Sequence, residues 1–190
     1  TLDAKTYRAL TGGSLRDALD GIKAAVKAGL YPVKLNMLVL DGVNEKEISR
    51  MIRFAMDSET ILQLIELEPV NVDASYYSRY HYPLDDVELE LGKQAFEVKT
   101  RGDMQNRRVY FLPSLKVEVV RPIENTEFCS RCTRLRVTSD GKLKPCLMRN
   151  DNLVDVLTPI RNGASDDDLK QLFSEAVRRR EPYYRAVKAN

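Results

Sequence analysis

The 190-residue sequence has little of what several protein classes require. It holds one histidine and three cysteines, which is poor material for a disulfide framework. It has no run of eighteen apolar residues, so no membrane-spanning helix is predicted. A signal-peptide pattern is also absent, and the expected compartment is the cytoplasm.

An excess of charge of one sign is missing as well. Lysine and arginine number 30 against 28 acidic residues, which gives a formal net charge of +2. Such a balance does not favour nucleic acid or an anionic membrane as a partner. Any positive field must therefore be local. Repeats and low-complexity tracts are absent too, and the composition is that of a globular protein.

The first third of the sequence alternates between helical and strand patterns. Apolar residues at helical spacing follow Ser14, and Gly29 marks the end of this predicted helix. Residues 31–40 alternate like a strand, with Lys34 and Asn36 on one face.

The same alternation of patterns predicts a second helix and a second strand. Asn44 is predicted to cap a helix that reaches Ala55. Residues 61–67 form a mostly apolar run, typical of a strand buried on both sides. Strand, helix and strand with short connections indicate a parallel sheet. An open doubly wound sheet and a (β/α) barrel both fit.

Lys34 and Asn36 have two interpretations. In a barrel lumen or at its mouth, both polar side chains would contact water or a functional group. Alternatively, the strand lies at a sheet edge and Lys34 extends to water.

After a tyrosine-rich connection at 69–83, a helix is predicted over about 84–98, with Val98 among its inward residues. Short strand candidates follow and predict a small antiparallel layer; they are VYFL, LKVEVV, RLRVT and KLKPCL. Asp-Gly within 139–141 predicts a hairpin turn. Ser165 opens a final amphipathic helix.

All three cysteines lie in residues 128–147, FCSRCTRLRVTSDGKLKPCL. The two residues between Cys129 and Cys132 let both thiolates reach one metal ion or cluster. The predicted hairpin brings Cys146 back toward them. Zinc would need a fourth ligand, whereas a four-iron cluster on three cysteines leaves one iron open. Three free cysteines packed in a core are the third alternative.

Basic residues surround these cysteines. The window 128–149 holds six basic residues and one acidic residue. This local positive charge favours the thiolate form of the cysteines and suits a polyanionic ligand. Arg134 and Arg136 are predicted to project from one face of a strand. Such a pair could bind phosphates bidentately or simply be solvated.

The cysteine–arginine motif closely resembles that of the MoaA family, the radical S-adenosylmethionine GTP 3′,8-cyclases of molybdenum cofactor biosynthesis. TLDAKTYRALTGG, PVKLNMLVLDGVNEKEI and LIELEPV also resemble successive segments of that family. The resemblance implies an α/β fold: the C-terminal part of an incomplete (β/α)6 barrel, then a small α+β domain with antiparallel strands. Residues 1–100 would be the barrel part and residues 101–190 the GTP-binding and auxiliary-cluster domain.

The resemblance also implies roles for individual residues. The ligands of an auxiliary [4Fe–4S] cluster would be Cys129, Cys132 and Cys146. The residues that bind GTP would be Lys34, Arg134, Leu135 and Arg136, and the lysine would then face the barrel lumen. No catalytic residue is assigned.

Departures from the family point to a fragment. The family's CxxxCxxC motif, which binds the cluster that cleaves S-adenosylmethionine, is absent. Gln63 stands where many members have arginine, and the chain ends KAN rather than Gly-Gly. S-adenosylmethionine and a second [4Fe–4S] cluster are expected in the full-length lyase, and the fragment alone is expected to be inactive. A homodimer is compatible with the sequence.

Overall fold

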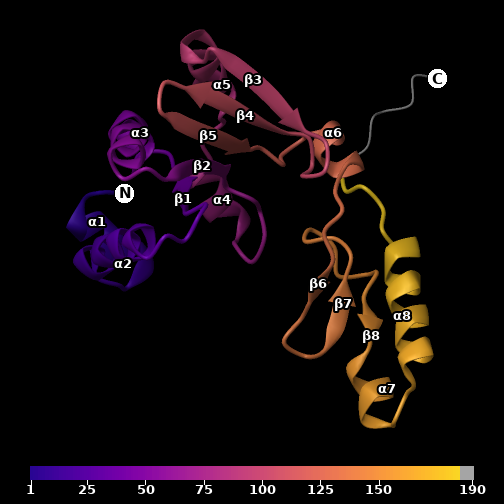
Figure 1. Ribbon diagram of the computed structural model, residues 1–190. Coiled ribbons are helices and arrows are strands. Elements are labelled where there is room, and N and C mark those ends of the chain that lie inside the picture. Colours follow the sequence, from indigo (N-terminus) through magenta and orange to yellow (C-terminus); the bar gives the residue numbers. More distant parts are fainter. Residues whose placement is uncertain (185–190) are drawn as a thin grey trace, which may run out of the picture. The chain divides into compact units, whose positions relative to one another are not determined.

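The computed structural model describes residues 1–184, which fold into two compact units (Figure 1). The first unit comprises Thr1–Arg101 and Arg107–Ile123, and the second comprises Gly102–Asn106 and the chain from Glu124 onward. A short loop between two strands of the first unit therefore belongs to the second. The assignment of a barrel part and a cluster domain stays a prediction.

Two capped helices open the first unit. These are α1 (Ala4–Thr11) and α2 (Leu15–Lys27). The Ser14 side chain accepts a hydrogen bond from the Asp17 amide, which satisfies one of the free donors at the start of α2. The helix predicted after Ser14 is confirmed, and Gly29 follows its end with φ of +73°.

A mixed five-stranded sheet forms the centre of the first unit, in the order β1-β2-β5-β4-β3. The first three strands in this order are parallel, whereas β4 and β3 are antiparallel to their neighbours. The strands are β1 (Lys34–Val39), β2 (Ile61–Glu66), β3 (Glu97–Arg101), β4 (Arg107–Leu112) and β5 (Leu115–Val120).

The crossover from β1 to β2 runs through η1 (Glu45–Glu47) and α3 (Ile48–Asp57). The predicted helix is present, and Asn44 lies at the N-cap position of η1, but its side chain makes no capping hydrogen bond. The buried Asn44 side chain accepts from the Leu40 amide at 2.8 Å and donates to the Leu38 carbonyl at 2.9 Å. It fixes the turn after β1, because a buried amide needs partners of its own.

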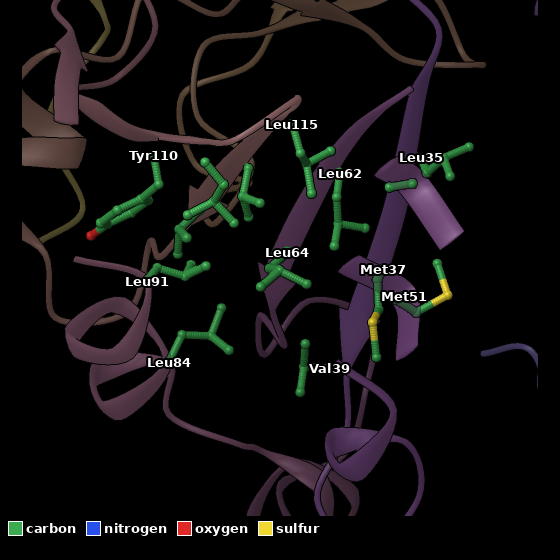
Figure 2. Packing of buried hydrophobic residues seen from close by; sticks show 14 residues of the cluster. Leu35, Met37, Val39, Met51, Leu62, Leu64, Leu84, Leu91, Tyr110 and Leu115 are labelled. Atoms are coloured by element: carbon green, nitrogen blue, oxygen red, sulfur yellow. The ribbon is translucent and has the colours of Figure 1, made fainter. Parts of the chain in front are cut away.

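One face of the sheet carries the main hydrophobic core. Leu62 and Leu64 of β2 are fully buried there, while the alternate residues of this strand are only partly buried. The two faces of β2 thus differ, contrary to the expected burial on both sides. Side chains from the strands, from α3 and from α5 (Asp85–Gln94) meet in this core (Figure 2).

Other expectations for the first unit are confirmed only in part. The helix expected over 84–98 ends at Gln94, and Val98 lies in β3 with 47% of its surface exposed. The tyrosine-rich connection contains a further helix, α4 (Ala74–Tyr80). The segments VYFL and LKVEVV contribute β4 and β5, which join the first sheet rather than a separate layer.

The second unit has a small three-stranded antiparallel sheet, ordered β6-β7-β8, and α8 contacts β7 and β8 (Figure 1). The predicted hairpin at 139–141 is confirmed, with Gly141 at φ +74°. The final helix is confirmed with a full capping box at Ser165 and Asp168. The elements are α6 (Thr126–Ser130), β6 (Arg136–Val137), β7 (Lys142–Lys144), β8 (Val154–Asp155), α7 (Leu157–Arg161) and α8 (Asp166–Arg178).

The architecture is thus mixed α/β, with one mixed sheet and one antiparallel sheet. This agrees with the predicted fold class at that level. Across residues 1–184, no helix is both long and apolar enough to cross a membrane.

Candidate functional site

The three cysteines belong to the second unit. Cys129 lies in α6, which Asn125 caps by accepting from the Phe128 amide at 2.9 Å. Cys132 follows one turn later, with its amide donating to the Cys129 carbonyl at 3.2 Å. Cys146 comes just after β7. All three are free and half-buried.

The thiol groups are electrostatic neighbours. Burial raises the pKa of Cys129, and the nearby Cys132 and Cys146 raise it further. Backbone N–H groups of Tyr183 and Tyr184 oppose this rise by hydrogen bonding to the thiol. In the described part of the chain, no three His, Cys, Asp or Glu side chains are grouped to hold a single metal ion.

Cys132 has two further partners that the sequence did not indicate. The Gln105 side-chain amide donates to Cys132 Sγ at 3.4 Å. The Arg180 guanidinium donates to the Cys132 carbonyl at 2.9 Å. Both partners are distant in sequence from the cysteine motif, and neither has a motif signal.

The segment after Cys132 carries the predicted GTP-binding residues. Arg134 is exposed and precedes β6, and one of its nitrogens lies 3.1 Å from Met104 Sδ. Arg136 lies within β6, opposite Lys144. The expectation that both arginines share a strand is therefore wrong. Leu135, which lies between the two arginines in the sequence, packs against the small core of the second unit.

The basic window is partly neutralised. Lys142 lies 2.8 Å from Asp140, and Arg149 pairs with Asp151 at 2.6 Å. Lys142 is the main cause that lowers the pKa of Asp140 to about 2, assisted by a hydrogen bond from Thr138. The remaining arginines of the window lack a carboxylate partner among the described residues: Arg131, Arg134 and Arg136.

Lys34 lies in the first unit and contacts a buried acid. Its Nζ is 2.6 Å from Glu118 Oε1 on β5, and Arg101 lies 3.5 Å from the same oxygen. The Glu118 side chain is only 5% exposed, and its Oε2 accepts no hydrogen bond within residues 1–184. Lys34 thus reaches across the sheet to Glu118 instead of extending freely to water.

The only histidine is also placed in the first unit. His81 Nε2 lies 3.0 Å from Glu66 Oε1, and burial raises the pKa of Glu66 despite this contact. His81 is therefore committed to Glu66 and does not complete a ligand set with the cysteines.

An open pocket of about 670 Å³ lies in the second unit beside Tyr183. Its lining is formed by Met148, Arg149, Asn150, Asp151, Pro182 and Tyr183. Arg134 and Arg136 do not line this pocket, which is therefore separate from the predicted phosphate contacts.

The fold and these contacts define an α/β chain whose second unit presents a cysteine–arginine site. A model of the family Molybdenum Cofactor Synthesis C matches residues 60–186. The chain belongs to this family. The resemblance found from the cysteine motif is thereby confirmed.

Individual relatives agree with this assignment. The chain is 48% identical over 192 residues to a probable GTP 3′,8-cyclase of Thermococcus kodakarensis, covering 97% of the chain and 62% of that relative. A probable GTP 3′,8-cyclase of Pyrococcus horikoshii is 50% identical over 191 residues, covering 97% and 61%. The chain thus spans about three fifths of the length of these curated relatives.

Proposed function

We propose that this chain supplies the GTP site and an auxiliary [4Fe–4S] cluster to a radical S-adenosylmethionine GTP 3′,8-cyclase of molybdenum cofactor biosynthesis. The observation that carries the proposal is three neighbouring thiols, followed in the sequence by arginines that have no carboxylate partner among residues 1–184. The complete enzyme would also contain S-adenosylmethionine and a second [4Fe–4S] cluster.

The donor set consists of three thiols, the soft ligands that bind iron–sulfur clusters. The Cys132 and Cys146 thiols lie close enough to Cys129 to raise the pKa of its thiol. In a four-iron cluster each cysteine binds a different iron, so the sulfurs need not converge on one point. The proposed ligands are Cys129, Cys132 and Cys146, and the cluster would supply an open iron for the guanine.

The arginines would hold the other end of the nucleotide. Arg134 and Arg136 carry permanent charge and bear donors in the fork geometry that suits phosphate oxygens. Leu135 anchors the segment between them in the small core. Lys34 of the first unit, whose side chain is held at Glu118, is also proposed to bind GTP.

The cluster assignment is tested by metal analysis after anaerobic reconstitution of the complete native protein. We expect iron and sulfide sufficient for two clusters, and the loss of about half of both from Cys146→Ala. Zinc at the three cysteines, with iron sufficient only for the other cluster, would overturn the proposal.

The nucleotide assignment is tested by GTP binding to the same protein. Arg134→Ala and Arg136→Ala should each weaken binding by roughly 1.5 kcal/mol, about tenfold, because each removes charge-assisted hydrogen bonds. Arg178→Ala is the control, since Arg178 lies on exposed α8 and pairs with Glu175. Unchanged affinity in both test variants would remove these arginines from the site.

A further inference from the structure

Two parts of the second unit outside the cysteine motif hold Cys132 and the residues after it. One is the loop Gly102–Asn106, which connects β3 to β4. The other is the segment that follows α8 and includes Arg180. Both reach the same stretch, Cys132–Arg134.

Gln105 makes a direct contact with the sulfur. Its side-chain nitrogen lies 3.4 Å from Cys132 Sγ, and the residue is only 5% exposed. Its backbone has φ of +63°, a conformation that costs energy for a residue with a side chain. The fold therefore maintains an unfavourable backbone conformation at the residue that presents an N–H donor to the sulfur.

Neighbours of Gln105 attach the same loop to the motif. The Asp103 carbonyl accepts from the Thr133 hydroxyl at 3.5 Å, and Met104 Sδ lies 3.1 Å from the Arg134 guanidinium. These contacts tie three successive loop residues to three successive residues of the motif. The Gln105 contact is thus part of an ordered interface within the second unit.

Arg180 holds the backbone of the motif. One guanidinium nitrogen donates to the Cys132 carbonyl at 2.9 Å, and another donates to the Arg134 carbonyl at 2.6 Å. The planar fork therefore spans the segment that links a proposed cluster ligand to a proposed phosphate ligand. Both acceptors are neutral, and no carboxylate of residues 1–184 pairs with Arg180. Its positive charge is accordingly retained beside the cysteine site.

We propose that Gln105 and Arg180 are positioning residues for this site, which raise the reduction potential of a cluster bound at Cys132 and order the Arg134 segment for nucleotide binding. This inference rests on the proposed function. Hydrogen bonds to the sulfur ligands and nearby charge are known determinants of iron–sulfur potentials. An N–H donor and a cation both stabilise the more negative, reduced cluster. Partners of ligands also orient the ligands themselves.

The Gln105 contact is tested by potentiometric titration of the complete native protein, with the auxiliary cluster followed by electron paramagnetic resonance. Gln105→Met keeps the size of the side chain but removes the donor, so the potential should become more negative. Gln105→Glu replaces the donor with an anion and should shift it further in the same direction. Gln171→Met, on the exposed surface of α8, is the matched control and should cause no shift.

The role of Arg180 is tested with two substitutions that separate charge from shape. Arg180→Lys keeps the charge but cannot span both carbonyls, so GTP affinity should fall several-fold with a small change in potential. Arg180→Met should lower both GTP affinity and potential. Arg178→Met should change neither property.

The outcomes distinguish this inference from the proposed function. A wild-type protein that binds no cluster at Cys129, Cys132 and Cys146 would overturn both. A wild-type protein with the cluster, whose potential and GTP affinity are unchanged in Gln105→Met and Arg180→Met, would overturn this inference alone. If Gln105→Glu does not fold, because it buries a charge, Gln105→Met still decides the question.

Discussion

The two units of the chain are stabilised in different ways. The first unit has fourteen buried hydrophobic residues in one cluster, beneath strands of five or six residues. In the described part of the second unit, the hydrophobic cluster has four buried residues, and the strands are two or three residues long. Apolar burial therefore contributes more to the stability of the first unit. The second unit relies more on turns, polar contacts and, in the proposed function, on its cluster.

The charged groups of the units differ as well. In the first unit, Lys34 and Arg101 share the buried carboxylate of Glu118. In the second unit, Arg134 and Arg136 have no acidic partner among residues 1–184. Lys34 and Arg101 are therefore paired within the first unit, whereas Arg134 and Arg136 have no such internal pair.

The largest expected effect is the loss of the proposed cluster from the second unit. Removal of iron by a chelator, or Cys146→Ala, should destabilise this unit by roughly 5 kcal/mol or more, because binding of a structural metal contributes directly to folding. Amide hydrogen exchange should rise at residues 124–184 and stay unchanged in the sheet of the first unit. Equal protection of both units after chelation would contradict this comparison.

A cavity in the main core should have the next largest effect. Leu64 is fully buried, so Leu64→Ala should lower the free energy of unfolding of the first unit by about 2–5 kcal/mol. Leu89→Ala is the control, since Leu89 lies on α5 with 64% of its surface exposed. Equal chemical-denaturation midpoints for the two variants would show that the core is not the source of stability.

A smaller effect is expected at the hairpin turn of the second unit. Gly141 has φ of +74°, and a Cβ atom added there would clash with Leu157 Cβ. Gly141→Ala should therefore cost about 1–3 kcal/mol, from backbone strain and the steric clash together.

Gly163 provides the matched control for this substitution. It also has positive φ, +80°, but no atom lies within 4 Å of its Cβ position. Gly163→Ala should then cost about 1 kcal/mol, from strain alone. Thermal unfolding of both variants measures the difference in stability. A larger loss of stability in Gly163→Ala than in Gly141→Ala would contradict a steric clash at Gly141.

The smallest expected effect is a pH dependence at the same turn. The pKa of Asp140 is lowered from 3.8 to about 2, chiefly by Lys142. A lowered acid pKa means that the pair stabilises the fold above pH 3.8 and that this contribution is lost as the pH falls through about 2. Nuclear magnetic resonance of the carboxyl group should give this low value, and Lys142→Met should return it toward 3.8. A pKa that stays near 2 in Lys142→Met would contradict the proposed cause.

Local signals in the sequence predicted a large part of the fold. Two helix N-termini, at Ser14 and Ser165, and the turn at Gly141 depend on residues a few positions apart. All three predictions are confirmed. Partners distant in sequence were not predictable in this way. The pattern of LKVEVV indicates a strand, but not that this strand would pair with β2.

The same limit applies to the candidate site. The cysteines and arginines are recognisable because their spacing is local. The contacts from Gln105 and Arg180 depend on how distant segments fold together, so no sequence pattern reveals them. Arg134 was misplaced because β6 begins only at Arg136, after Leu135 turns into the small core.

The most direct test of the central claim is the Mössbauer spectrum of the auxiliary cluster in the complete native protein, recorded with and without GTP. If Cys129, Cys132 and Cys146 hold a four-iron cluster with one open iron, GTP should change the signal of one iron and leave the other three largely unaltered. A spectrum that is identical with and without saturating GTP would contradict the account.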